Sequence, residues 1–219
     1  MAVERRRSLM TTLLALSLVA LAPGSSVGQA LYDAFIRAVE TDDIEQLRPM
    51  LARGMDPNTV DPHGEPVLVV AARAGWQPTL EALLAAGARV DTANSFGDRP
   101  IMVAALGGHL TIVKTLLARG AALDTPGWTP LIYAATSGHT DVVRYLVDAG
   151  AAIDAVSPNG TTALMMAARA GHAATVELLL ARGADANHRN NSGASALGWA
   201  KRDGFEAIES MLRRRGARD

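Results

Sequence analysis

The sequence predicts an all-α solenoid of about six helix-turn-helix units, joined by short β-hairpin-like fingers. The first observation is a glycine that recurs every 33 residues, with one interval of 30. The second is another glycine series that shows the same shortening at the same place. The two series are Gly54, Gly87, Gly120, Gly150, Gly183 and Gly216, and Gly64, Gly97, Gly127, Gly160 and Gly193. Units of this length are too small to bury their own apolar faces, so we expect them to stack.

The first helix of each unit has recognisable ends. At 129–135 the sequence ThrProLeuIleTyrAlaAla begins with a hydroxyl that can cap free amides and a proline suited to the first helical turn. The alanine pair allows a neighbouring helix to approach closely. A glycine, here Gly138, follows after two variable residues and predicts the end of the helix, because glycine adopts a positive φ without strain.

The second helix of each unit carries one apolar face. Val143, Leu146 and Val147 follow spacings of three and four residues, and equivalent residues recur in the other units. Gly150 ends this helix. The turn-rich stretch that follows suits a hairpin-like finger.

The two ends of the array differ from its interior. Glu209 and Arg213 stand where inner units have apolar residues, as expected of a polar cap. The first unit keeps Phe35 and Leu47, but Asp42 replaces the glycine that ends its first helix. Within a repeat domain at 31–219, the predicted boundaries are caps at about 31–60 and 188–217, and full repeats at about 61–93, 94–123, 124–156 and 157–187.

These features resemble the ankyrin repeat, whose hallmark is ThrProLeuHis-x-Ala-Ala, then GlyHis, then LeuLeu-x-x-GlyAla. The resemblance covers about residues 31–217 and extends to exported, periplasmic ankyrin proteins of bacteria. It implies a protein-binding module that uses its concave surface of fingers and first helices. The hallmark histidine, which ties neighbouring fingers together in the family, is replaced here, so we expect a drier helix surface and looser fingers. Its positions hold Val69, Met102, Ile132, Met165 and Gly198.

The N-terminus has the pattern of a secretory signal peptide at 1–30. A basic start, Arg5 to Arg7, precedes an apolar run from Leu13 to Ala22, and small residues lead to a cleavage site after Ala30. An uncleaved anchor is the alternative. Arg6 and Arg7 also fit a twin-arginine export signal, with an ordinary basic segment as the alternative. We therefore expect a periplasmic protein.

Composition excludes several classes of partner and chemistry. There is no cysteine, which suits an oxidising compartment and excludes thiol chemistry. The mature chain would hold 18 basic and 21 acidic residues, a net charge of −3, which argues against binding to nucleic acid or to anionic membranes. No phosphate-binding loop, zinc-protease motif or serine-hydrolase motif is present. We expect no catalytic residue, cofactor, metal or small-molecule substrate.

Histidines and aspartates recur with the repeat, and we expect structural roles for them. His109, His139 and His172 lie in the GlyHis position and should hydrogen-bond to neighbouring backbone, whereas His63 and His188 are expected to face solvent. The aspartates should cap turn amides through their side chains rather than bind calcium. They are Asp91, Asp124, Asp154 and Asp185.

The resemblance places partner-binding residues at variable positions beside the repeated framework. The candidates are His63, Glu65, Arg73, Phe96, Asp98, Leu106, Trp128, Thr136, Asn159, Arg169 and Arg202. Phe96 and Trp128 are typical interface anchors, although Trp128 could instead pack against its own finger. Arg73 and Arg169 could pair with acidic groups of a partner, or simply be solvated.

The three-residue deletion before Trp128 should notch the row of fingers, either as a docking notch or as a tolerated loop change. The partner would be a protein. The alternative function is a secreted effector or inhibitor that acts on a host or competitor protein through the same surface.

Overall fold

The computed structural model describes residues 26–218, so the predicted signal peptide lies largely outside the described residues. Residues 26–30 are the exception, because they belong to the first helix. By its contacts the chain divides into two units, Met1–Ala34 and Phe35–Asp219. The second unit contains all the repeats and is called the repeat unit.

The described residues form twelve α-helices and no strand longer than an isolated bridge. The prediction of an all-helical repeat solenoid is therefore confirmed. In chain order the helices are α1 (Ser26–Glu40), α2 (Ile44–Ala52), α3 (Val67–Ala74), α4 (Gln77–Ala85), α5 (Pro100–Leu106), α6 (Leu110–Ala118), α7 (Pro130–Ser137), α8 (Thr140–Asp148), α9 (Ala163–Arg169), α10 (Ala173–Ala181), α11 (Ala196–Arg202) and α12 (Glu206–Arg214).

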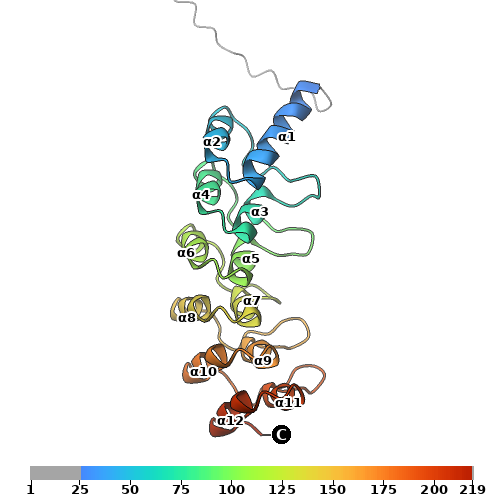
Figure 1. Ribbon diagram of the computed structural model, residues 1–219, viewed down its shortest axis with the longest axis vertical. Coiled ribbons are helices and arrows are strands. Elements are labelled where there is room, and N and C mark those ends of the chain that lie inside the picture. The colour runs from blue at the N-terminus through green and yellow to red at the C-terminus, as the bar shows by residue number, and fades with distance from the viewer. Residues whose placement is uncertain (1–25, 219) are drawn as a thin grey trace, which may run out of the picture. The chain divides into compact units, whose positions relative to one another are not determined.

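The helices of the repeat unit form two columns (Figure 1). One column holds the first helices of the repeats, which pack on one another in chain order: α3, α5, α7, α9 and α11. The other column holds the second helices, which also pack on one another in chain order: α4, α6, α8, α10 and α12. The fingers project on the side of the first helices, away from the second helices (Figure 1). The finger tips and the first helices therefore share one surface.

The core is a continuous layer of small and aliphatic side chains between the two columns. In α7, Leu131, Ile132, Ala134 and Ala135 are all buried, and the other inner repeats follow the same pattern. The residues that replace the hallmark histidine are buried as well, except at the last position, where Gly198 is exposed. At the four inner repeats an apolar side chain is thus buried where the hallmark has histidine, and the expectation of a drier helix surface stays a prediction.

Hydroxyl caps begin the first helices where the sequence predicts them. The side chain of Thr129 accepts a hydrogen bond from the Ile132 amide at 3.2 Å, and that of Thr162 accepts one from the Met165 amide at 3.3 Å. Such a cap stabilises a helix by about 1 kcal/mol. These two caps fix the points at which the fingers before α7 and α9 return to their helices.

The glycine that follows the first helix of each inner repeat has two roles. Gly138 has a φ of 74°, and a Cβ built on it would lie 2.5 Å from Nδ1 of His172 in the next repeat. The same glycine therefore ends α7 and leaves room for the imidazole that packs against it. Only the first of these roles was predicted from the sequence.

The fingers close as hairpin-like turns. In each full-length finger a backbone amide bonds to the carbonyl four residues later, for example Asn94 N to Asp98 O at 3.0 Å. The side chain of Asn94 accepts from two further amides, those of Phe96 and Asp98. In the shortened finger, the Thr125 hydroxyl instead donates to the Trp128 carbonyl at 3.2 Å.

Side chains of one repeat also hold the backbone of the next. Asp91 accepts from the Ala122 amide, Asp124 from the Ala152 amide and Asp154 from the Asp185 amide, at 3.0 to 3.3 Å. Asp185 caps an amide of its own turn. The predicted capping role of the aspartates is confirmed, and the structure adds that three of them join neighbouring repeats.

The two ends of the array differ from its interior in the structure as they do in the sequence. Glu209 and Arg213 form an ion pair of 3.0 Å on the last helix. Asp42 has a φ of 53°, the one non-glycine residue among 26–218 with a positive φ, and it stands where inner repeats have glycine. The first helix begins at Ser26, upstream of the predicted domain start and through the predicted cleavage site.

Candidate functional site

The predicted residues occupy repeated positions along the finger side. One row crosses the fingers and another follows the ends of the first helices. The finger row is Glu65, Asp98, Trp128, Thr161 and Ala194, and the helix-end row is Arg73, Leu106, Thr136, Arg169 and Arg202. The side chains differ in charge, size and polarity along both rows, although the same helix-turn-helix backbone recurs in each repeat. Such variation is expected where variable residues determine which partner is bound.

A groove of about 280 Å³ lies at the shortened finger, in the middle of the array. It is bounded by two exposed aromatic side chains, Phe96 at 87 % and Trp128 at 38 % of their full exposure. Its lining comes from three successive fingers and the start of α5: Phe96, Gly97, Asp98, Arg99, Met102, Thr125, Pro126, Gly127, Trp128 and Pro158. The three-residue deletion therefore coincides with a hollow between fingers of normal length.

Trp128 is held from one side by the following helix. Its ring centroid lies 5.7 Å from that of Tyr133, at an interplanar angle of 51°. Its packing partner is thus Tyr133 of α7, while part of the indole remains exposed to the groove. Tilted aromatic pairs of this kind add about 0.5–1.5 kcal/mol beyond the area they bury.

Tyr133 in turn holds Asp98. Its hydroxyl donates a hydrogen bond to Oδ1 of Asp98 in the previous repeat. Burial, this hydrogen bond and the charge of Asp98 all raise the pKa of Tyr133 above its usual value. The phenol therefore stays neutral, and the groove holds an ordered carboxylate beside two aromatic rings.

The first finger is closed by an internal ion pair. Arg73 Nη1 donates to Glu65 Oε2 at 2.8 Å, and the other atoms of the pair make a second bond. Asn94 of the next finger donates to Glu65 at 3.1 Å. Arg73, predicted to meet an acidic group of a partner or to be solvated, pairs within the chain while half of its side chain stays exposed.

The far end of the surface carries a cationic cluster. The Arg169 guanidinium lies 5.4 Å from the centroid of the Trp199 ring, a cation–π contact. Arg202 donates two hydrogen bonds to Asp203, at 2.7 and 2.8 Å, which lower the pKa of that carboxyl. Both predicted arginines thus have partners within the chain.

The other predicted residues lie apart from the groove. His63 and Asn159 are exposed on separate fingers, and Leu106 is exposed at the end of α5. The Thr136 hydroxyl donates back to the Ile132 carbonyl at 2.7 Å, within its own helix. Of the eleven candidates, Phe96, Asp98 and Trp128 come together in the groove, and Glu65 and Arg73 form the ion pair of the first finger.

Four histidines bond to backbone carbonyls of the preceding repeat. Nε2 of His109, His139 and His172 lies 3.0 to 3.1 Å from the carbonyls of Arg73, Leu106 and Thr136, which confirms the predicted role. The expectation that His188 faces solvent is wrong. Its Nε2 lies 2.8 Å from the Gly160 carbonyl, because the tight turn at that glycine presents the oxygen to the next finger.

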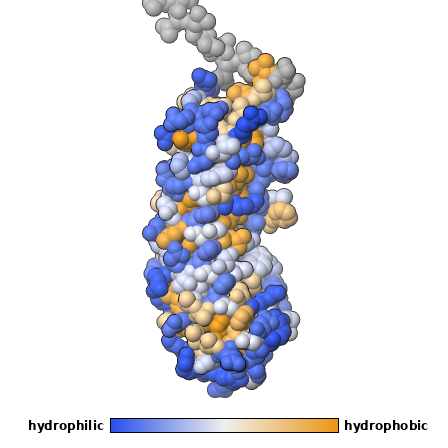
Figure 2. All heavy atoms as spheres, in the orientation of Figure 1, coloured by the Kyte–Doolittle hydropathy of each residue, from blue (hydrophilic) through white to orange (hydrophobic). Residues whose placement is uncertain are grey.

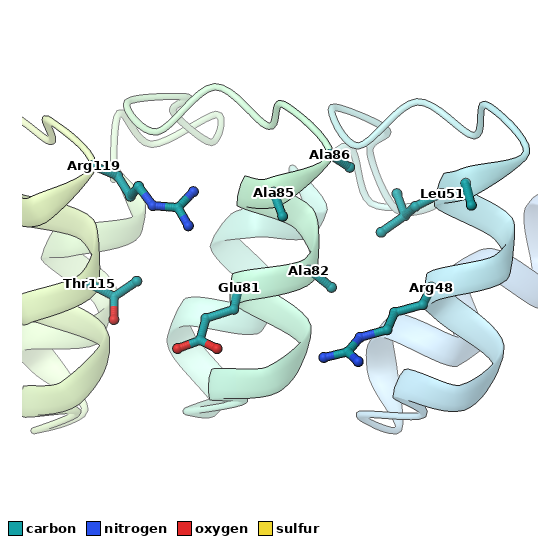
Figure 3. A pocket seen from close by; sticks show the side chains of 9 residues that line it. Arg48, Leu51, Glu81, Ala82, Ala85, Ala86, Thr115 and Arg119 are labelled. Carbon is teal, nitrogen blue, oxygen red and sulfur yellow. The ribbon is translucent and has the colours of Figure 1, made fainter.

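A wider hollow of about 570 Å³ lies on the second helices (Figure 3). Small side chains, Ala82 and Ala85 in α4 and Ala86 directly after it, line the centre of the hollow. Arg48 from α2 and Arg119 after α6 extend toward α4 from either side (Figure 3). The remaining lining residues are Leu51, Ala52, Glu81 and Thr115. This hollow contains no predicted residue and no aromatic side chain.

The face seen in Figure 2 shows no large uninterrupted apolar area in the repeat unit, since hydrophobic and hydrophilic residues alternate along the stack. Within residues 26–218, no three histidine or acidic side chains are grouped as metal ligands would be. In the same part of the chain, no helix has the length and apolarity needed to cross a bilayer.

Sequence reasoning missed three residues that shape the surface: Tyr133, Pro158 and Trp199. Tyr133 and Trp199 share one position of the first helix, which holds Val70, Val103 and Met166 in the other repeats. The sequence did contain a signal for these two residues, because an aromatic side chain with a polar group stands where the other repeats have an unbranched or branched apolar side chain. Pro158 had none, because it lies in the groove only through the shortening of the finger before it.

A family model for ankyrin repeats, three copies in length, matches the chain in four overlapping stretches, at 35–126, 77–157, 119–190 and 149–218. Together these matches span the whole set of repeats. A comparison with curated proteins gave no significant match.

Proposed function

This chain belongs to the ankyrin-repeat family, whose repeats generally act as protein–protein interaction modules, and we propose that it is a non-enzymatic scaffold that binds a protein partner through its fingers and first helices. The observation that carries this proposal is the groove at the shortened finger. Phe96 and Trp128 expose aromatic surface there, and Phe96 is almost fully exposed. Aromatic side chains of this kind are the commonest anchors of protein interfaces.

The contacts around the groove favour binding over catalysis. The carboxylate of Asp98 accepts from the Tyr133 phenol, whose pKa is raised, so this phenol is not prepared to release a proton near neutral pH. The ordered finger backbone and the packed indole instead give a surface that loses little conformational freedom on binding.

Affinity capture with matched variants tests this function. The full chain, a Phe96→Ala/Trp128→Ala variant and a Glu81→Gln control on α4 are each used to capture proteins from a bacterial envelope extract. We expect a specific protein to be retained by the wild type and the control and to be lost from the double variant. Equal retention by all three proteins would exclude the groove as the binding site.

We further propose that the mature protein acts in the periplasm. The support is the basic start, the apolar run and the small residues before Ala30. Cleavage after Ala30 would leave the buried side chains of α1, which lie between Phe35 and Val39, on the mature chain. Fractionation and N-terminal sequencing test this: the mature protein should begin at Leu31, and a cytoplasmic chain with an intact start contradicts it.

The export route has its own test. Replacing Arg6 and Arg7 with lysine should stop export if the twin-arginine pathway is used. Unchanged export assigns the basic segment to an ordinary signal peptide.

A further inference from the structure

The groove at the shortened finger has walls suited to one or two side chains. Its volume of about 280 Å³ is slightly below the 300–1,000 Å³ typical of small-molecule pockets. Its apolar lining includes the side chains of Phe96, Trp128, Pro126 and Pro158. Flat aromatic and proline surfaces of this kind receive proline or aliphatic side chains from an extended segment, as in grooves that recognise polyproline helices.

The groove also carries one uncompensated charge. Its two charged lining residues are Asp98 and Arg99, and Arg99 lies 3.5 Å from Asp91, with which it forms an ion pair. Among residues 26–218, the one side chain that hydrogen-bonds to the Asp98 carboxylate is Tyr133, a neutral donor. A neutral phenol orders the carboxylate without cancelling its charge, so a cation is the complementary group.

Asp98 is fixed before any ligand arrives. Its amide donates to the Asn94 side chain at 2.9 Å, its carbonyl accepts from the Asn94 amide, and its carboxylate is bound by Tyr133. Tyr133 packs against Trp128, so the carboxylate and the aromatic wall are held by the same side chain. Little ordering is then required on binding, which increases the contribution of each contact to affinity.

We propose that this groove binds an extended segment of a partner protein in which a proline or aliphatic residue lies next to a lysine or arginine. The apolar residue occupies the space between Phe96 and Trp128, and the cation pairs with Asp98. This inference rests on the proposed function, since it specifies the chemistry of the partner at the same groove.

Selection from a library of random 12-residue peptides displayed on phage, with the full chain as target, tests the inference. We expect the selected peptides to combine a proline or aliphatic residue with a lysine or arginine within two positions. Binding of the best synthetic peptide is then measured by fluorescence polarisation. The proteins compared are the wild type, Asp98→Asn, Phe96→Ala and Glu81→Gln.

Asp98→Asn keeps an oxygen that can accept from Tyr133 and removes only the charge. It should weaken binding about three- to tenfold, the effect of losing one charge-assisted contact at a partly exposed site. Glu81→Gln makes the same change of net charge on the second helices, and binding should stay within about twofold of the wild type. Phe96→Ala should weaken binding at least as much as Asp98→Asn does.

The outcomes separate the two proposals. In one outcome, the selected peptides need Phe96 for binding but contain no preferred lysine or arginine, and they bind Asp98→Asn as tightly as the wild type. That outcome overturns this inference and leaves the proposed binding surface intact. Peptides whose binding is indifferent to Phe96, or a selection that enriches no sequence, contradict both.

Discussion

The hydroxyl of Tyr133 in α7 donates a hydrogen bond to Asp98, which lies in the finger of the preceding repeat. The bond joins residues 35 positions apart and orders the carboxylate of Asp98, which lines the groove. It links the repeat framework, which the glycine spacing determines, to the variable residues that we propose to contact a partner.

Tyr133→Phe tests the energetic role of this bond. Near neutral pH the variant should be about 1 kcal/mol less stable, because one hydrogen bond is lost. The pKa of Tyr133 is raised in the folded protein, so its contribution is fully present below the unfolded pKa of about 10 and is lost as pH rises through the folded pKa. Urea denaturation at several pH values measures both effects. A stability difference that stayed constant up to about pH 11 would contradict this assignment.

Gly138→Ala tests the second role of the helix-ending glycine. A Cβ would clash with His172, in addition to the strain of a positive φ. Gly150→Ala is the control, because its φ is also positive but its Cβ would meet nothing within 4 Å. We expect the control to lose about 1 kcal/mol from strain and Gly138→Ala to lose about 1–3 kcal/mol more. The extra loss should disappear in a His172→Ala background. Equal losses for the two variants in urea denaturation show that the imidazole contact is unimportant.

Phe96→Ala and Trp128→Ala should differ in their effects on folding. Phe96 is almost fully exposed, so its removal should change the free energy of unfolding by less than about 0.5 kcal/mol. Trp128 packs against Tyr133, so its removal should cost about 1–2 kcal/mol. Thermal and urea denaturation of the two variants check this. A large loss for Phe96→Ala contradicts its assignment as a binding residue with no structural role.

Restoring the length of the shortened finger tests the origin of the groove. Thr125 and Pro126 are replaced by the five residues found at 155–159, which adds the three missing positions. Stability should change by less than about 1 kcal/mol, because loops tolerate insertion. Binding of the peptide or captured partner should be lost as the groove is filled. Unchanged binding in a folded variant indicates that the deletion is only a tolerated loop change.

The polar end of the array should prevent stacking between molecules. Glu209→Val/Arg213→Val gives the last helix the apolar residues that Val143 and Val147 supply in an inner repeat. An exposed apolar face then lacks a neighbour, so we expect concentration-dependent association. Light scattering after size-exclusion chromatography measures it. A monomer at all concentrations contradicts the role of these residues as a cap.

The framework could be predicted because the repeat makes each local feature visible several times. A glycine that recurs after each helix indicates a positive φ, and a threonine before a helix indicates a cap, as seen at Gly138 and Thr129. Both depend on interactions within a few residues. The stacking of the units follows from their size and from their apolar faces.

The pairs between side chains could not be predicted in the same way. Periodicity shows which rows lie on the finger side, but it does not show that Glu65 pairs with Arg73 within its own repeat, or that Tyr133 reaches Asp98 in another. These choices depend on rotamers and on the length of each finger. His188 illustrates the limit, because it lies outside the GlyHis position and still bonds to a carbonyl of the preceding repeat.

Photocrosslinking tests the central claim most directly. A benzoyl-phenylalanine introduced in place of Phe96 keeps an aromatic ring in the groove, and the same residue in place of Glu81 reports on the second helices. In cells, the probe at position 96 should yield a covalent adduct with one protein, and the adduct should disappear when Trp128→Ala is added. No adduct at position 96, or the same adduct from both positions, would show that the finger surface is not where this protein meets its partner.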